Sequence, residues 1–158
     1  GDDRGRSGGS SRGPAGPMVF TMSASKLKGM DTFGKNDPYV QIGTYPSTKK
    51  ADTKEGWSEK DFRSIVQTKV VRDSNDPKFA PITVPKIEDL AKSDSDKILF
   101  VVWDDDDKKK LGNTTDRDII GVGYASLRDC MSSAGAKIPL FNFKKSKTAG
   151  DVGTLMVS

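Results

Sequence analysis

The stretch KILFVVWDDDDKKKLGNTTDRDIIG, residues 97–121, joins a continuously apolar run to a cluster of aspartates. The run Ile98–Trp103 is apolar at every position, which is typical of a strand in the centre of a sheet. It is far shorter than the about 20 residues that cross a bilayer. Asp104–Asp107 follow at once, and Asp118 stands just before a second apolar run. The stretch therefore predicts two neighbouring strands joined by an acidic loop.

Similar short apolar runs recur along the chain from Met18 onwards. Eight runs, rich in Val, Ile, Thr and aromatic residues, are separated by Gly, Pro, Asn and Asp. This pattern is typical of an all-β sandwich or barrel. The predicted strands cover residues 18–24, 39–45, 65–71, 81–85, 97–103, 119–127, 138–143 and 153–158.

Three segments lie outside this pattern. Residues 1–17 are mainly Gly, Ser, Arg and Pro, which predicts a disordered tail. Their Arg-Gly pairs also fit an RNA-binding arm, although a linker explains them better. Residues 46–64 form a long polar insertion, and residues 127–135 predict one or two helical turns that end at Gly135. We expect residues 18–158 to form a single domain.

The composition excludes several kinds of site. The chain has no His and a single cysteine, Cys130, so Ser-His-Asp and Cys-His triads and the usual zinc sets are excluded. Any metal must be held by oxygen, which indicates Ca²⁺ or Mg²⁺. The lack of disulfides favours a cytoplasmic location, with Cys130 as a small, partly buried thiol. No signal peptide opens the sequence.

The net charge of +4 indicates a mild preference for anionic partners. It is weaker than the basic field of a dedicated nucleic-acid-binding domain, so we expect no nucleic acid. Membrane contact, if there is any, must be peripheral, since no apolar run is long enough to span a bilayer.

Two aspartate clusters on separate loops carry the functional signal. Asp31 and Asp37 lie between the first two strands, and the second cluster contains Asp104, Asp106 and Asp118. Alternation along a strand turns Asp104 and Asp106 to the same side. If loop 31–37 lies at the same end of the sandwich as the second cluster, five carboxylates converge. They would repel one another unless a cation is bound, and several loop oxygens suit Ca²⁺ better than Mg²⁺. Either cluster alone also fits a solvated acidic turn.

Both clusters resemble the calcium-binding loops of C2 domains. The motif LxxxDxxGxxDPYV at residues 27–40 is similar to the first loop, and WDxD at 103–106 with DIIG at 118–121 is similar to the third. The resemblance covers residues 18–158. It implies an eight-stranded antiparallel β-sandwich of type II connectivity, as in the phospholipase-like and copine-like branches, because no strand candidate precedes Met18.

The resemblance also implies which residues hold Ca²⁺. Side-chain ligands transfer to Asp31, Asp37, Asp104, Asp106 and Asp118, and backbone ligands to Met30 and Asp105. The chain departs from the family at residues 76–80, which read DPKFA where the family usually reads NPxWN. The third loop is also longer than usual, so Asp107 or Asp116 remains an alternative member of the cage.

Residues suited to a membrane stand beside the carboxylates. We expect the loop tips to contact lipid through Phe33, Lys108, Lys109, Lys110 and Leu111. A second basic surface, able to bind phosphoinositide, is predicted from Lys69, Arg72 and Lys78.

The predicted function is Ca²⁺-dependent binding to anionic phospholipids, phosphatidylserine or phosphoinositides, which targets a larger protein peripherally to membranes. We expect a monomer without enzyme activity. One alternative is a Ca²⁺-independent protein-interaction module that uses residues 46–64. A metal-dependent transferase with a DxD motif at 104–106 is disfavoured, because no nucleotide-binding Gly pattern follows a strand.

Overall fold

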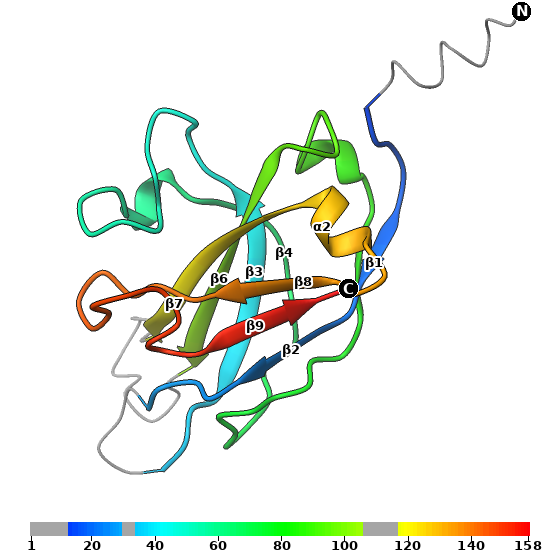
Figure 1. Ribbon diagram of the computed structural model, residues 1–158. Helices are drawn as coiled ribbons and strands as arrows, with labels where there is room; N and C mark the ends of the chain where they lie inside the picture. The colour runs from blue at the N-terminus through cyan, green and yellow to red at the C-terminus, as the bar shows by residue number, and fades with distance from the viewer. Residues whose placement is uncertain (1–12, 30–33, 106–116) are drawn as a thin grey trace, which may run out of the picture.

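The computed structural model describes residues 13–29, 34–105 and 117–158 (Figure 1). The described part contains nine strands, one short α-helix, α2 (Leu127–Met131), and the 3₁₀ turns η1 (Glu59–Asp61) and η2 (Ile87–Asp89). All strand pairs are antiparallel. The strands are β1 (Met18–Phe20), β2 (Met22–Ser25), β3 (Pro38–Thr44), β4 (Arg63–Gln67), β5 (Ile82–Val84), β6 (Lys97–Asp105), β7 (Arg117–Ser126), β8 (Ala136–Pro139) and β9 (Thr154–Val157).

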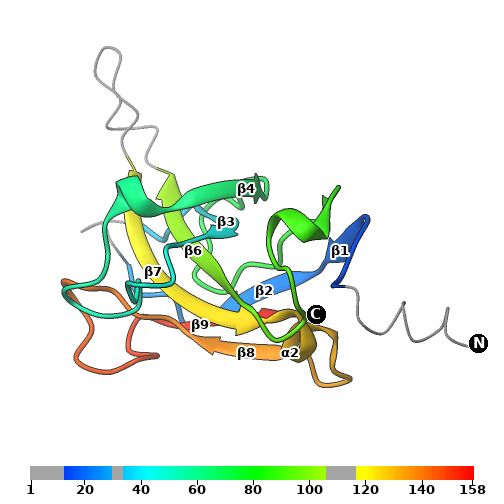
Figure 2. The same ribbon diagram turned by 90° about the horizontal axis from the view of Figure 1, so that it is seen from above.

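The strands form two layers, which Figure 2 shows from above. One layer is the four-stranded sheet β4-β3-β6-β7, and the other contains the sheet β2-β9-β8, with β1 and β5 paired separately. The main core fills the space between them, with Phe20, Ile42, Phe100 and Leu155 almost fully buried. The all-β antiparallel sandwich predicted from the sequence is confirmed.

The central run of β6, Ile98–Trp103, is apolar at every position, and both faces of the strand are covered there. Ile98, Phe100 and Val102 belong to the main core, whereas Leu99, Val101 and Trp103 belong to a second cluster on the outer face of the four-stranded sheet. Alternation along the strand sends every second side chain to the opposite face. A run of six apolar residues therefore needs two hydrophobic layers, and the molecule provides both.

The insertion at residues 46–64 supplies much of that outer layer. Trp57 and Phe62 pack against the second cluster together with Tyr45, the residue before the insertion. The rings of Tyr45 and Trp57 stack at 5.9 Å between centroids. The insertion was predicted as a polar excursion, but its few aromatic residues fold it back onto the sheet.

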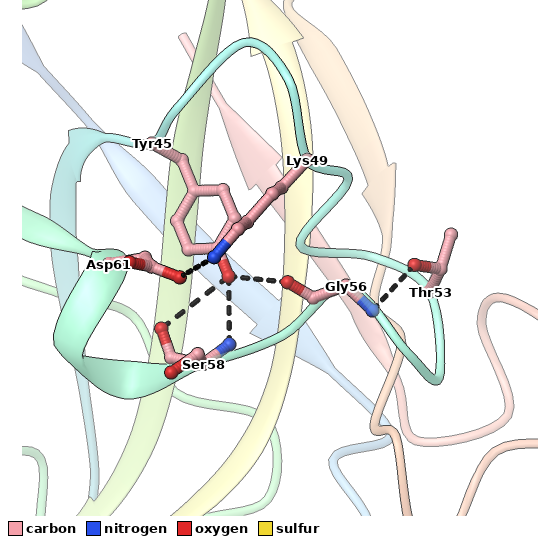
Figure 3. Close-up of polar contacts among 6 residues, drawn as sticks. All are labelled: Tyr45, Lys49, Thr53, Gly56, Ser58 and Asp61. Atoms are coloured by element: carbon pink, nitrogen blue, oxygen red, sulfur yellow. Dashed lines mark hydrogen bonds and ion pairs between the residues drawn. The ribbon is translucent and has the colours of Figure 1, made fainter.

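Hydrogen bonds from one hydroxyl close the insertion into a compact loop (Figure 3). The Tyr45 hydroxyl donates to the carbonyl of Gly56 at 2.5 Å and accepts from the N–H of Ser58 at 2.7 Å. Lys49 and Asp61 form an ion pair of 2.6 Å across the same loop. The ion pair thus ties the two ends of the insertion to each other, and the Tyr45 hydroxyl ties residues 56–58 to the residue that follows β3.

The predicted strands differ from the observed ones mainly at their ends. The first run, 18–24, divides into two strands because β1 pairs with β5 and β2 pairs with β9. The seventh run, 138–143, leaves its sheet after Pro139, and β8 begins earlier, at Ala136. The predicted helical turns form α2, where the Ser126 side chain accepts a hydrogen bond from the third helical residue.

The chain is held to the domain from Gly16 onwards. Its N–H donates to the Glu88 side chain at 2.9 Å, and its carbonyl accepts from the N–H of Ile87, also at 2.9 Å. Residues 1–12 lie outside the described part.

Candidate functional site

The register of three neighbouring strands brings three predicted ligands to one end of the four-stranded sheet. Pro38 of β3 lies opposite Asp104 of β6, and Asp104 lies opposite Asp118 of β7. Directly opposed residues of antiparallel strands project to the same face of a sheet. Asp37, the residue before β3, lies at the same end. Asp104 is only 1% exposed, whereas Asp37 and Asp118 are partly exposed.

Main-chain hydrogen bonds join two of these aspartates directly. The N–H of Asp37 donates to Oδ1 of Asp104 at 2.7 Å, and the N–H of Asp105 donates to the carbonyl of Asp37 at 2.9 Å. The second carboxylate oxygen of Asp104, Oδ2, is also buried. Because burial of a carboxylate is costly without polar partners, this arrangement fixes Asp104 at the start of β3.

The connection between β4 and β5, residues 68–81, contributes a cation to the site. Nη1 of Arg72 lies 3.0 Å from Oδ2 of Asp105 and 3.8 Å from Oδ2 of Asp37. The N–H of Asp73 donates to Oδ1 of Asp37 at 2.7 Å. Asp73 has a φ of 55°, which aspartate tolerates better than most residues. Asp37 is therefore held on one side by an amide and faces a guanidinium on the other.

A buried asparagine, which the sequence patterns did not indicate, connects the loops behind this site. Asn36 is 1% exposed, and its Nδ2 donates to the carbonyl of Lys28 at 2.9 Å and to Oδ1 of Asn75 at 2.8 Å. The N–H of Ser74 donates to the Asn36 carbonyl at 2.8 Å. The only sequence signal is its position immediately before Asp37.

The donor set fits an oxygen-preferring cation, but only as part of a larger set of ligands. Asp37, Asp104 and Asp118 offer carboxylate oxygens, the ligands that Ca²⁺ takes in proteins. Within the described residues, however, no group of three or more His, Cys, Asp or Glu side chains is placed to hold a metal ion by itself. The predicted ligands Met30, Asp31 and Asp106 lie outside the described residues.

Other predicted residues of the loop tips also lie outside the described part. These are the lipid-contacting residues Phe33, Lys108, Lys109, Lys110 and Leu111 and the alternative ligands Asp107 and Asp116.

The three residues of the predicted phosphoinositide surface have different surroundings. Lys69 and Lys78 are exposed, and Lys78 forms an isolated bridge with Ser23 of β2. Arg72 instead turns its guanidinium to Asp105 at the carboxylate site. Its placement links it to the predicted calcium loops, and the phosphoinositide role of the three residues stays a prediction.

The thiol of Cys130 lies away from this site, in the main core at α2. Burial, with a smaller contribution from the Asp129 charge, raises the pKa of Cys130 from 9.0 to about 11. The thiol is therefore protonated at neutral pH and is a poor nucleophile. None of the described helices has the length and apolar character needed to cross a membrane.

Solved structures share this fold at low sequence identity. BON1-C2B superposes with a TM-score of 0.64 at 17% identity, over 92% of this chain and 90% of that one. A C2 domain of plant Extended Synaptotagmin 1 gives a TM-score of 0.55 at 16% identity, over 92% and 93%. No curated protein sequence is significantly similar to the chain.

The sequence model of the C2 domain family matches residues 18–138, which include the four-stranded sheet and the aspartates at its end. This match covers more than half of the chain, and the resemblance seen in the sequence is therefore confirmed: the chain belongs to the C2 domain family.

Proposed function

We propose that this C2 domain binds anionic phospholipid membranes in a Ca²⁺-dependent manner. The observation that supports the proposal is the placement of Asp37, Asp104 and Asp118 at the same end of the sheet, set by the register of β3, β6 and β7. The ligand set is completed by Asp31, Asp106 and the backbone of Met30, as the family motif implies.

The aspartates of this end perform two tasks. Asp104 is buried and fixes the start of β3, so it orients Asp37 as well as offering its own oxygens. Asp37 and Asp118 are more exposed and can meet an incoming cation. Bound Ca²⁺ would supply positive charge and coordination positions for lipid phosphate. Without a cation, the carboxylates repel an anionic surface.

Calcium titration combined with vesicle sedimentation tests this proposal. Calorimetry should detect Ca²⁺ binding, and phosphatidylcholine–phosphatidylserine vesicles should sediment the domain with Ca²⁺ but not with a chelator. Asp118→Asn keeps the shape of the side chain and removes one charge. Since a unit charge at about 4 Å is worth roughly 1–4 kcal/mol near a surface, it should weaken Ca²⁺ binding about tenfold or more.

Asp89→Asn provides the matched control, because Asp89 is an exposed carboxylate in η2, before β6 rather than after it. It should leave Ca²⁺ and vesicle binding unchanged. Equal losses in both variants would mean that overall charge, and not the carboxylate site, controls binding. Vesicle binding that persists in chelator would reject the Ca²⁺ dependence.

A second candidate function is Ca²⁺-independent protein binding through the insertion. A cavity of about 770 Å³ lies between residues 44–52 and residues 88–97, with Tyr124 in its lining. These residues include the start of β6, whereas the carboxylate site lies at its end. Binding of a protein partner that is unaffected by chelator and by Asp118→Asn would favour this alternative.

Both functions assign the domain a recruiting role without catalysis. We infer a monomeric module in the cytoplasm that attaches a larger protein peripherally to membranes, with phosphatidylserine or phosphoinositides as the lipids. Sedimentation equilibrium of the isolated domain checks the monomer.

A further inference from the structure

The loop between β8 and β9, residues 140–153, contains a basic group that plays no part in the sequence prediction. Lys144, Lys145 and Lys147 are all exposed. Within the described residues, no carboxylate lies within ion-pair distance of any of the three. Nζ of Lys144 lies 5.6 Å from the ring centre of its neighbour Phe143. The three lysines and Phe143 together form what we call the basic loop.

A buried side chain attaches the basic loop to the start of β7. Asn142 is 2% exposed, and its Nδ2 donates to the carbonyls of Ile119 at 2.9 Å and Ile120 at 3.2 Å. Ile119 directly follows Asp118, one of the predicted ligands. Figure 1 shows the loop on the same side of the molecule as the start of β7. The basic loop is therefore held beside the carboxylate site.

The same asparagine fixes the backbone of the lysines. Its Oδ1 accepts from the N–H of Lys144 at 2.9 Å and of Lys145 at 3.1 Å. The Asn142 N–H donates to Oγ of Ser146 at 2.9 Å. The lysine backbone is thus ordered before any partner binds, which lowers the entropy cost of docking.

The acidic residue of this loop is occupied by the loop itself. Asp151 accepts from the Thr148 side chain at 2.7 Å and from the backbone N–H groups of Lys147 at 2.9 Å and Thr148 at 3.0 Å. Hydrogen bonds from Thr148 and Lys147, with a smaller effect of the Lys28 charge, lower the pKa of Asp151. Its carboxylate bonds the backbone and leaves the lysine ammonium groups to the solvent.

The far end of the loop contacts the chain that leads into the first predicted calcium loop. The N–H of Lys28 donates to the carbonyl of Val152 at 3.0 Å. The loop between β8 and β9 therefore contacts the chain beside both aspartate clusters. It bonds Ile119, next to Asp118, and Lys28, just before the first predicted calcium loop.

We propose that the basic loop is a second membrane-docking surface, which contacts anionic lipid headgroups next to the calcium loops. The proposal rests on the proposed function, because a flat bilayer that meets the carboxylate end also meets a loop fixed beside it. Three exposed ammonium groups, none of them paired with a carboxylate of the described residues, suit lipid phosphates and carboxylates, and Phe143 adds an apolar edge. A bilayer is favoured over an acidic protein as the partner, because the basic loop lies beside the carboxylate end that is proposed to meet the membrane.

The test compares two triple variants with the same change in charge. Lys144→Gln, Lys145→Gln and Lys147→Gln neutralise the basic loop. The control changes three exposed lysines elsewhere, two in the insertion and one at the start of β6: Lys54→Gln, Lys60→Gln and Lys97→Gln. Sedimentation with phosphatidylcholine–phosphatidylserine vesicles is measured at saturating Ca²⁺, in chelator, and across a salt series.

At saturating Ca²⁺, the loop variant should bind vesicles about tenfold or more weakly, since each lysine near an anionic leaflet is worth roughly a fivefold change. Its salt dependence should also be smaller, because fewer charges are screened. The control should stay within about twofold of the native domain, which is the size of a nonspecific charge effect. Calcium affinity without lipid should be unchanged in both variants.

The outcomes separate this inference from the proposed function. If native binding requires Ca²⁺ but the two triple variants bind equally well, the basic loop is not a membrane-docking surface. An acidic protein is then the partner to test for this loop. If native binding persists in chelator and only the loop variant loses it, the calcium proposal fails and the basic loop is supported. If the native domain does not sediment with the vesicles, both are overturned.

Discussion

At the scale of single residues, Arg72 adds a positive charge to the predicted calcium site. Its guanidinium lies 3.0 Å from Asp105 and 3.8 Å from Asp37. A positive charge of the protein therefore lies beside the place where we expect a divalent cation to bind. Its side chain is 54% exposed, so solvent weakens the interaction. In the absence of metal, Arg72 relieves repulsion among the carboxylates. In the presence of metal, it opposes the bound cation.

We therefore expect Arg72→Gln to raise the affinity for Ca²⁺. Removing one screened positive charge from the neighbourhood of a divalent cation is worth about 1 kcal/mol, or roughly fivefold in Kd. Calorimetry without lipid measures the change. Arg128→Gln is the matched control, because Arg128 forms an exposed ion pair of 2.8 Å with Asp94, and α2 lies at the end of β7 away from Asp118. A weaker Ca²⁺ affinity in Arg72→Gln would show that Arg72 mainly positions Asp37.

At the scale of elements, the insertion at 46–64 determines what the outer face of the four-stranded sheet can do. Trp57 and Phe62 bury part of that face, which in a bare sheet would expose Leu99 and Val101. The Tyr45 hydroxyl makes two of the hydrogen bonds that hold the insertion, beside the ion pair of Lys49 with Asp61 and the hydrogen bond of the Ala51 N–H to the Tyr124 hydroxyl. Loss of the Tyr45 hydroxyl should therefore weaken the attachment of the insertion.

Tyr45→Phe should destabilise the domain by about 1–2 kcal/mol, because it leaves the N–H of Ser58 and the carbonyl of Gly56 without the hydroxyl. Tyr124→Phe should cost less, since the Tyr124 hydroxyl accepts from the N–H of Ala51 at a longer distance, 3.1 Å. Urea denaturation measures both. Calcium binding should be unchanged, because Tyr45 follows β3 and Asp37 precedes it. Equal stability of all three proteins would show that the insertion is not held through this hydroxyl.

At the scale of the whole molecule, cation binding at the carboxylate site should be coupled to the stability of the folded domain. The Asp37, Asp104 and Asp118 carboxylates come from three segments that meet only in the folded chain. A ligand that binds this arrangement and not the unfolded chain must stabilise the fold, by RT ln(1 + [L]/Kd).

Calcium should therefore raise the melting temperature. At about one hundred times Kd the gain is about 2.7 kcal/mol, which corresponds to roughly 8 °C for a domain of this size. Mg²⁺ should raise it less, since loop ligands suit the larger and more flexible coordination of Ca²⁺. Differential scanning calorimetry with each ion checks the order. A melting curve that does not move with Ca²⁺ would contradict the calcium assignment, and Asp118→Asn should reduce the shift.

The strands and the kind of ligand that a metal site could use were predictable from the sequence. Apolar runs and their separators are local, so they predicted the all-β sandwich and placed Asp104 at the end of β6 and Asp118 near the start of β7. The absence of His and of a second Cys limited any metal site to oxygen ligands. Composition and alternation are sufficient for these conclusions because each depends on residues close together in the chain.

Several contacts between side chains could be seen only in the folded molecule. It placed Arg72 against Asp105 and attached the basic loop to Ile119 through Asn142. It also turned a polar insertion into the cover of a second core through Trp57. Each of these contacts joins segments that are distant in sequence, and their meeting depends on strand register and on burial in the assembled sandwich. Local periodicity contains no information on either, so no pattern in the sequence predicts them.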